Sequence, residues 1–96
     1  MNTRQRFKEL VRQCLDADDL GWHFWLSIGD KWITGEIEVE SNGDEYIVVY
    51  LVDRVDYCGY PFGNILVDAY IDLKDVPEAV ETRAGDVFDY LIEELR

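Results

Sequence analysis

Apolar and polar side chains alternate between residues 22 and 52, and two turn signals divide this stretch into three runs. Gly29-Asp30 and Asn42-Gly43 are dipeptides that favour tight hairpin loops, because these residue types adopt positive φ at little cost. Alternation with a period of about two residues is typical of strands with one buried face. We therefore predict a three-stranded antiparallel meander over this stretch.

A two-residue loop would fix the pairing in the first hairpin, since antiparallel partners count outward symmetrically from the loop. Around residues 29 and 30, Trp25 then faces Thr34 and His23 faces Glu36. The residues predicted to face the core are Trp22, Phe24, Leu26, Ile33, Ile37 and Val39. The opposite face is predicted to carry His23, Trp25, Ser27, Trp32, Thr34, Glu36, Glu38 and Glu40. This count places two tryptophans beside a row of carboxylates.

The same two-residue count around Asn42-Gly43 pairs Val39 with Tyr46 and Ile37 with Val48. The residues that the third strand would add to the core are Tyr46, Val48, Tyr50 and Val52. The residues that it would place beside the tryptophans are Ile47, Val49 and Leu51. Because both sides of this strand are apolar, we predict that it is central in the sheet.

Helical periodicity is present at both ends of the chain. Thr3 is a candidate N-cap for a helix that runs to residue 18 or 19. Its apolar stripe consists of Phe7, Leu10, Val11, Cys14 and Leu15. Near the other end, Asp75 and Pro77 are typical of a helix start. Gly85 leaves two alternatives open: one helix over residues 77–95, or a short turn followed by a helix from about residue 84.

A loop and a fourth strand are predicted between the meander and the last helix. The loop covers residues 53–64 and holds Tyr57, Tyr60 and Phe62. We expect these rings to cover the core, and the alternative is that they are exposed and anchor a partner. The predicted strand covers residues 65–72. One side of it carries Ile65, Val67, Ala69 and Ile71. The other side carries Leu66, Asp68, Tyr70 and Asp72.

The predicted order of elements is α-β-β-β-β-α, which indicates a single α+β domain over residues 1–96 with a four-stranded antiparallel sheet. We expect both helices on the face that carries Trp22 and Phe24, which leaves the face with Trp25 and Trp32 open. The alternative, one helix on each face, would bury the two tryptophans. An open apolar face of this size indicates a partner or a homodimer.

Charge narrows the range of partners. The chain holds 9 basic and 21 acidic residues, which gives a net charge of −12. An anionic body repels nucleic acid and acidic membranes and attracts basic protein surfaces. We therefore expect no direct contact with nucleic acid or membranes, and we expect the four cations of the first helix to pair with acidic neighbours. The competing explanation is that the acidity serves solubility alone.

The sequence offers no recognisable catalytic or metal-binding motif. His23 has no serine or cysteine partner in a known arrangement, and the zinc, calcium and nucleotide motifs are missing. Glu36, Glu38 and Glu40 would spread over about 13 Å of strand instead of converging on a metal ion. We therefore expect a protein that is not an enzyme and uses no cofactor.

Cysteine usage indicates a reducing compartment. Cys14 and Cys58 do not form a disulfide framework, and no signal peptide, transmembrane run or lipidation motif is recognisable in the sequence. We expect a cytoplasmic protein. Cys14 falls on an apolar helical stripe and should be buried, while Cys58 has no nearby His or Lys to activate its thiol.

In size, acidity and lack of catalytic chemistry, the chain resembles small phage-encoded anti-CRISPR and other DNA-mimic proteins, and also the acidic immunity proteins of nuclease toxins. The resemblance implies a non-catalytic inhibitor that occupies the nucleic-acid-binding surface of a basic nuclease or CRISPR effector, in the host cytoplasm if the protein is phage-encoded. The alternatives are immunity to a nuclease toxin and an adaptor or self-associating domain. The predicted partner-binding residues are Trp25, Trp32, Glu36, Glu38, Glu40, Tyr57, Tyr60, Asp68, Asp72, Asp86 and Asp89.

Overall fold

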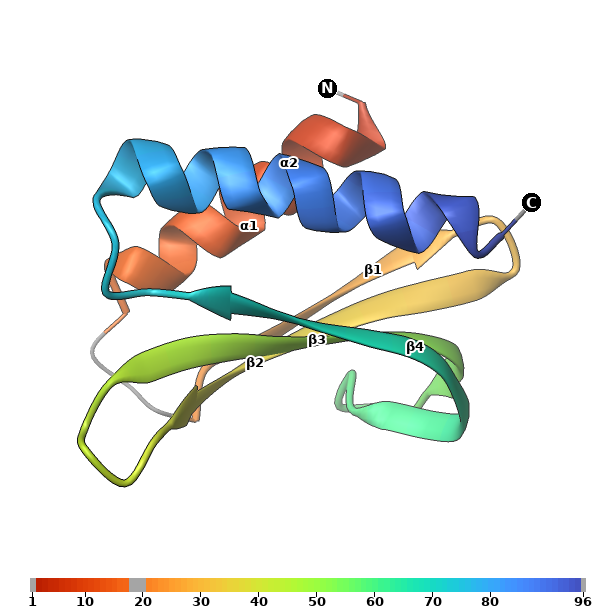
Figure 1. The fold of residues 1–96 in the computed structure, drawn as a ribbon. Coiled ribbons are helices and arrows are strands. Elements are labelled where there is room, and N and C mark those ends of the chain that lie inside the picture. Colours follow the sequence, from red (N-terminus) through yellow and green to blue (C-terminus); the bar gives the residue numbers. More distant parts are fainter. Residues whose placement is uncertain (1, 18–20, 96) are drawn as a thin grey trace.

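Two helices and four strands follow one another in the predicted order (Figure 1). The structure, a computed structural model, describes residues 2–17 and 21–95. The elements are α1 (Thr3–Leu15), β1 (His23–Ile28), β2 (Lys31–Val39), β3 (Glu45–Val55), β4 (Pro61–Asp72) and α2 (Pro77–Glu93). The fold is therefore α+β: along the chain, an N-terminal helix is followed by an antiparallel sheet and then by a C-terminal helix. Within the described residues, no helix is long and apolar enough to cross a membrane.

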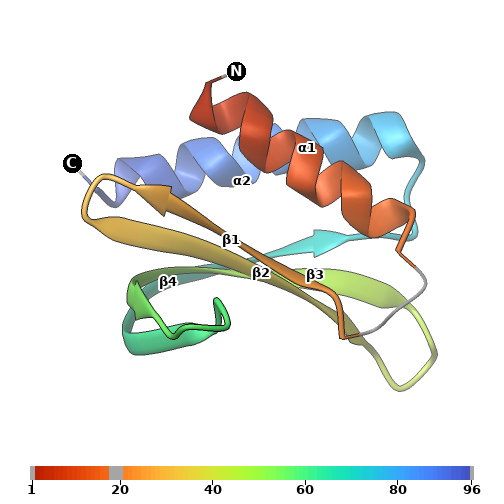
Figure 2. The same ribbon diagram turned by 180° about the vertical axis from the view of Figure 1, so that it is seen from behind.

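The strands lie in the order β1-β2-β3-β4, so each strand pairs with its neighbour in sequence. The third strand is central, as predicted from its two apolar sides. Both α1 and α2 lie on the same face of the sheet, which the two opposite views of the ribbon show (Figure 1, Figure 2). This confirms the expected arrangement and leaves the other face of the sheet without a helix.

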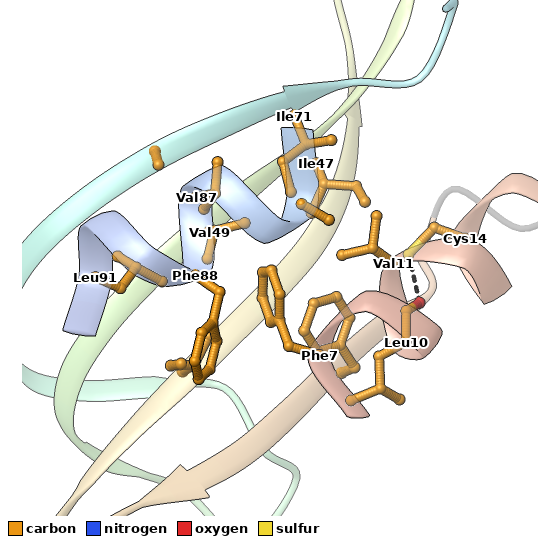
Figure 3. Packing of buried hydrophobic residues seen from close by; sticks show 14 of the residues in the cluster. Phe7, Leu10, Val11, Cys14, Ile47, Val49, Ile71, Val87, Phe88 and Leu91 are labelled. Carbon is orange, nitrogen blue, oxygen red and sulfur yellow. Dashed lines mark hydrogen bonds between the residues drawn. The ribbon is translucent and has the colours of Figure 1, made fainter. Parts of the chain in front are cut away.

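The core fills the layer between the sheet and the helices (Figure 3). The centre of the Phe7 ring in α1 lies 5.8 Å from that of Phe24 in β1 and 5.8 Å from that of Phe88 in α2, so this ring joins three elements. The other buried members of the core are Leu10, Val11, Cys14, Ile33, Ile37, Ile47, Val49, Leu51, Ala69, Ile71, Val80, Ala84, Val87 and Leu91. Burial of one large apolar side chain contributes about 1.5–3 kcal/mol, so apolar packing holds the helices on the sheet.

The first hairpin has the predicted register, with Trp25 opposite Thr34. Gly29 has a φ of 59° and the next residue has a negative φ, as a two-residue type II′ loop requires. The core face of this hairpin is also as predicted, except at Val39. This residue is the last of β2, and its side chain is 46% exposed instead of buried.

The second hairpin differs from the prediction by one residue. Ile37 pairs with Ile47 instead of Val48, because the loop contains three residues instead of two. The Gly43 amide donates to the Glu40 carbonyl at 2.9 Å, and within this loop Gly43 alone has a positive φ, of 93°. A tight turn followed by a glycine in the left-handed region is the usual form of a three-residue hairpin loop.

A shift of one residue exchanges the two sides of a strand. The β3 residues that face the core are therefore Ile47, Val49 and Leu51, which were predicted to lie beside the tryptophans. The residues predicted for the core, Tyr46, Val48, Tyr50 and Val52, lie instead on the helix-free face. Tyr46 consequently faces Glu38 and not Val39.

The predicted loop over residues 53–64 is much shorter in the structure. β3 runs to Val55 and β4 begins at Pro61, and the Asp56 amide donates to the Tyr60 carbonyl at 2.9 Å across the loop. Gly59, with a φ of 87°, gives this loop the same three-residue form as the second hairpin.

The aromatic residues of this region do not cover the core as predicted. Tyr57 is 98% exposed, and Tyr60 and Phe62 are also exposed. The register between β3 and β4 also shifts next to Val52. Ile65 is therefore exposed, although it was predicted on the same side of the strand as Val67, Ala69 and Ile71, which face the core.

The N-terminal helix is shifted toward the start of the chain relative to the prediction. Asn2, and not Thr3, caps α1, because its side-chain Oδ1 accepts a hydrogen bond from the Gln5 amide at 2.8 Å. The helix ends at Leu15, short of the predicted end. Residues 18 and 19 of that prediction lie outside the described residues.

The C-terminal helix continues through Gly85, so the first of the two alternatives is confirmed. A Cβ atom at this position would lie 2.6 Å from Nη2 of Arg4. The glycine therefore leaves room for the Arg4 guanidinium beside α2. The Arg4 guanidinium uses this space to reach Asp89, with Nε donating to Oδ1 at 3.0 Å.

Candidate protein-binding surface

The helix-free face of the sheet divides into a covered half and an open half. The covered half lies next to β1, where the tip of the β3–β4 hairpin, residues 56–60, folds back over the sheet on the side away from the helices (Figure 2). The open half lies over the ends of β2, β3 and β4 that the tip does not reach. The two halves contain different residue types and must be considered separately.

Aromatic stacking holds the hairpin tip on the covered half. The His23 ring stacks on Tyr60 with 4.1 Å between ring centres and on Trp25 with 5.5 Å. His23 Nε2 lies 2.8 Å from the Cys58 carbonyl oxygen, and Gly59 packs directly against the Trp25 indole. We call the set His23, Trp25, Cys58, Gly59 and Tyr60 the hairpin clasp.

The hairpin clasp changes what the tryptophan face offers to a partner. The His23 imidazole contacts the tip of the hairpin, so it does not form the simple surface pair with Glu36 that the register alone suggested. Trp25 remains 45% exposed and Trp32 is half-buried, so neither ring belongs to the core. Val48, behind the clasp, is 3% exposed. The open apolar patch predicted for this face is therefore partly covered by the protein itself.

The open half combines three tyrosines with carboxylates from β2 and β4. We call it the tyrosine–carboxylate face and define it by Glu36, Glu38, Glu40, Tyr46, Tyr50, Asp68, Tyr70 and Asp72, of which Glu36 and Tyr50 lie at the border with the hairpin tip. Alternation along antiparallel strands brings these side chains to one side, since residues two apart on a strand share a face. The tyrosines of β3 stand between the carboxylates of β2 and those of β4.

Hydrogen bonds between phenols and carboxylates order this face. Tyr46 Oη donates to Glu38 Oε2 at 3.1 Å, directly across the β2–β3 pair. Tyr70 Oη donates to Asp68 Oδ2 at 3.4 Å, and the Tyr46 and Tyr70 ring centres lie 5.8 Å apart. The Tyr46 and Tyr70 rings are thus held next to each other.

The carboxylates also keep the phenols protonated. The hydrogen bond to Glu38 raises the pKa of Tyr46, and burial adds to the rise. Burial raises the pKa of Tyr50, and the negative charge of Glu38 adds to it. Both phenols therefore remain hydrogen-bond donors well above neutral pH.

A groove of about 580 Å³ borders the tyrosine–carboxylate face. Its lining consists of Glu40, Tyr46, Tyr70, Asp72, Asp75 and Arg83. Most of these residues are acidic or aromatic, so the groove suits a cationic side chain, which binds carboxylates by charge and aromatic rings by cation–π attraction.

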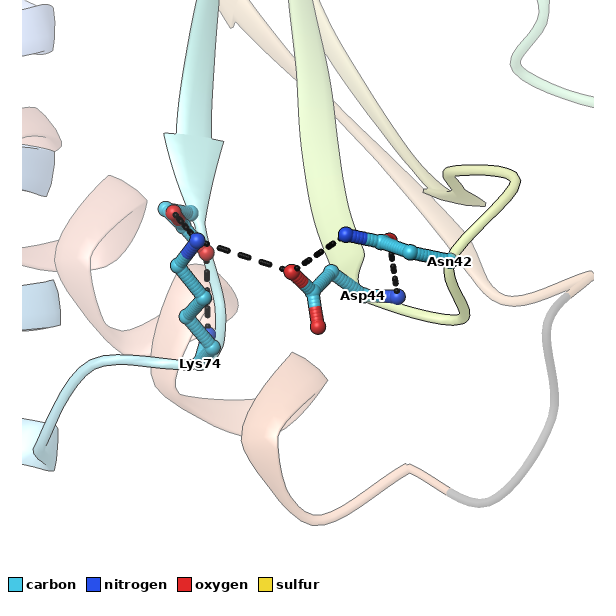
Figure 4. A network of polar contacts seen from close by, with 4 residues as sticks. Asn42, Asp44 and Lys74 are labelled. Atoms are coloured by element: carbon cyan, nitrogen blue, oxygen red, sulfur yellow. Dashed lines mark hydrogen bonds and ion pairs between the residues drawn. The ribbon is translucent and has the colours of Figure 1, made fainter.

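Lys74 connects the second hairpin loop to the end of β4 (Figure 4). Its Nζ lies 3.5 Å from Asp44 Oδ2 and 3.5 Å from Asp72 Oδ2. Asn42 supports Asp44 from the loop, with Nδ2 donating to Oδ2 at 3.1 Å. The charge of Asp72, followed by that of Asp44, raises the pKa of Lys74.

Three of the four cations of α1 pair with acids, as the sequence predicted, whereas Lys8 forms no ion pair within the described residues. Arg4 contacts Asp89 at 3.0 Å, Arg12 Nη1 contacts Glu81 Oε1 at 2.6 Å, and Arg6 contacts Glu9 within the helix at 3.5 Å. These pairs partly neutralise the helical layer. Among the described residues, no cation forms an ion pair with the carboxylates of Glu36, Glu38, Glu40 or Asp68.

The predicted partner-binding residues are found in three places. Those on the tyrosine–carboxylate face are Glu36, Glu38, Glu40, Asp68 and Asp72. Those at or near the hairpin clasp are Trp25, Trp32, Tyr57 and Tyr60. Those on α2, on the opposite layer, are Asp86 and Asp89, and Arg4 already pairs with Asp89. The prediction missed Tyr46 and Tyr50 because it assumed a two-residue loop in the second hairpin, and it placed Tyr70 beside Asp68 and Asp72 without counting it as a binding residue.

The fold and this surface define a small α+β domain with an anionic, tyrosine-bearing sheet face. Among residues 2–17 and 21–95, no three His, Cys, Asp or Glu side chains are grouped so that they could hold a metal ion. Comparisons with protein-family models, with curated proteins and with solved structures found no match to this chain. The functional argument therefore depends on the chemistry of the surface.

Proposed function

We propose that the protein is a non-catalytic, cytoplasmic binding protein that inhibits a basic nucleic-acid-handling protein by occupying its nucleic-acid-binding surface, as anti-CRISPR proteins do. One observation carries this proposal. On the helix-free face, Glu36, Glu38, Glu40 and Asp68 form no ion pair within the described residues and surround three tyrosines, whereas Arg4 and Arg12 of α1 each pair with an acid of α2. This face therefore presents negative charge and aromatic rings together, a combination that suits a basic protein surface.

The spacing of the carboxylates supports competition with nucleic acid. The acids of β2 and those of β4 are separated by one strand, β3, so the two rows lie about 10 Å apart. This separation is between the widths of the two grooves of B-DNA, about 6 and 12 Å, which separate its phosphate strands. A protein groove that holds two phosphate strands with Lys and Arg can therefore meet both rows at once.

The tyrosines can contribute binding affinity that exposed charges alone do not provide. Exposed ion pairs contribute little affinity, while aromatic residues that become buried at an interface often contribute most of it. Tyr70 is 54% exposed, and Tyr46 and Tyr50 are half-buried beside it. The rings of Tyr46 and Tyr70 are preordered by hydrogen bonds to Glu38 and Asp68, which lowers the entropy cost of binding.

A salt series with matched charge variants tests the proposal. Binding to a guide-loaded CRISPR effector and to a basic nuclease domain is measured by fluorescence anisotropy between low and high ionic strength, with duplex DNA as competitor. The sheet variant replaces Glu36, Glu38 and Glu40 with glutamine. The control variant replaces three acids of the helical layer, Glu78, Glu93 and Glu94, and has the same net charge.

We expect the unmodified protein to compete with DNA and to bind more weakly as salt rises. The sheet variant should lose at least about tenfold in affinity, and the control variant should lose clearly less. Equal losses in both variants would show that net charge alone drives binding. Simultaneous binding of DNA and protein to the same partner would contradict inhibition by occupation. Neutralisation of a toxin nuclease alone would identify an immunity protein instead.

A further inference from the structure

β4 forms an open edge of the sheet. The Leu73 amide donates to the Glu45 carbonyl at 3.1 Å, so Leu73 and Glu45 form a hydrogen-bonded pair of the ladder. In such a pair, the backbone N–H and C=O groups of the β4 residue are directed toward β3. Because such pairs alternate along an antiparallel ladder, Asp68, Tyr70 and Asp72 turn their backbone groups away from β3. Arg83 Nη2 lies 3.3 Å from the Tyr70 carbonyl oxygen, as this direction requires.

The open edge retains backbone donors that can pair with another strand. In the part of the chain that the structure describes, the outward amides of Asp68 and Tyr70 have no hydrogen-bond partner. Unpaired N–H groups along a strand are a template for strand addition. The Arg83 guanidinium donates to the outward carbonyl of Tyr70, so in the free protein it competes with an incoming strand for this acceptor.

Two hollows accompany this edge. The groove of about 580 Å³ on the side of Asp72 and a second one of about 360 Å³ are both bordered by Tyr70 and Arg83, so the Arg83–Tyr70 contact lies between them. The second hollow is also lined by Val87 and Tyr90 of α2. The edge therefore offers Asp72 and Tyr70 beside one hollow, and Asp68 together with the side chains of Val87 and Tyr90 beside the other.

We infer that the outer edge of β4 binds an extended, basic segment of the partner protein as an additional strand. The inference rests on the proposed function and specifies how the partner is held. Alternate side chains of the added strand would face Asp68, Tyr70 and Asp72, so lysine or arginine fits these positions. The remaining side chains would face Val87 and Tyr90, so apolar residues fit there. The occupant is a segment with alternating basic and apolar residues.

Charge excludes the simplest alternative, a second copy of this chain. An antiparallel pair of two β4 edges centred on Tyr70 would set Asp68 of one copy opposite Asp72 of the other. Like charges directly opposite each other destabilise a strand pair. A basic segment from another protein removes this repulsion and gains attraction from the same carboxylates.

A pair of peptides separates strand addition from attraction by charge. The probe is a short fluorescein-labelled peptide of alternating lysine and valine. The control peptide has the same sequence with N-methyl groups on alternate backbone nitrogens, which keeps its charge and removes the amides needed for pairing. We expect the probe to bind at least about tenfold more tightly than the control, since two or more hydrogen bonds are at stake. The amides of Asp68 and Tyr70 should also become protected from hydrogen exchange.

Two substitutions at one position test the edge from the protein side. Asp68→Asn removes the charge and keeps the amide, whereas Asp68→Pro removes both, and proline is tolerated on a strand edge where the amide faces solvent. The proline variant should bind the probe at least about tenfold more weakly than the asparagine variant. Circular dichroism checks that both variants are folded. Arg83→Ala should tighten binding of the probe, because the Tyr70 carbonyl is then free to accept a hydrogen bond from the added strand.

Equal binding of the probe and the N-methylated peptide would overturn the inference, and so would equal affinity of the two Asp68 variants. Either result leaves the proposed function standing if the Glu36, Glu38 and Glu40 variant still loses binding to the CRISPR effector. A dimer of the unmodified chain that Asp68→Pro abolishes, seen by analytical ultracentrifugation, would also overturn it, because a second copy would then occupy the edge.

Discussion

The Gly59→Ala substitution should release the hairpin clasp, because two separate costs fall on this residue. Its φ of 87° lies in the region that glycine adopts freely, and an alanine there is strained by about 1–2 kcal/mol. A Cβ atom would also clash with the Trp25 ring, so the indole must move. Movement of the indole disturbs the stacking on His23, and such ring pairs contribute about 0.5–1.5 kcal/mol each.

The free energy of unfolding should therefore fall by about 1.5–3.5 kcal/mol. Gly43→Ala is the matched control: Gly43 holds the same position in the second hairpin with a φ of 93°, and no atom lies within 4 Å of its Cβ position. This control should lose about 1–2 kcal/mol, from backbone strain alone. The difference between the two variants measures the ring contact.

Urea denaturation followed by circular dichroism gives both free energies, and the native tryptophan emission of Gly59→Ala should shift to longer wavelength. A Trp25→Ala background provides a second check, since Gly59→Ala should then cost no more than the control does in the unmodified protein. Equal losses for Gly59→Ala and Gly43→Ala in the unmodified protein would refute the argument, and the tip would then be held by its own hydrogen bonds alone.

Three further outcomes can be measured with simple variants. Phe7→Ala should lower the free energy of unfolding in urea by about 3–5 kcal/mol, because the ring is fully buried between the sheet and α2. The hydrogen bond from Arg4 lowers the pKa of Asp89, so this carboxylate stabilises the fold above its ordinary pKa and the stabilisation is lost as the pH falls through the lowered value. When the pH is lowered below about 4, the melting temperature of Asp89→Asn should therefore fall less than that of the unmodified protein. Burial raises the pKa of Cys14 to about 12, so Ellman's reagent should titrate a single thiol, that of exposed Cys58, until the protein is unfolded.

The sequence was sufficient for the element order and for the first hairpin. Gly29 next to Asp30 allows a two-residue loop, and the alternation on both flanking strands permits one register. The second hairpin could not be settled in the same way. β3 is apolar on both sides, so a shift of one residue leaves the pattern equally plausible, and the pattern could not correct the wrong loop length.

A local signal for the correct loop length was nevertheless present. In both three-residue loops an acidic residue lies three positions before the glycine, Glu40 before Gly43 and Asp56 before Gly59, and the glycine amide donates to that residue's carbonyl. The hairpin clasp had no comparable signal. It brings His23 to Tyr60 through the twist of β3 and β4, and a twist of this kind is a property of the whole sheet.

The exclusive pairing of sequence neighbours in the sheet has a consequence for how the protein folds. Each hairpin can form from a short stretch of chain and then align the next strand, so the search for sheet partners is brief. The contact between α1 and α2 is different, because it joins the two extremes of the chain and closes a large loop. We expect this closure to be the slow event, and the N-terminal helix to be the first element to detach when the protein opens.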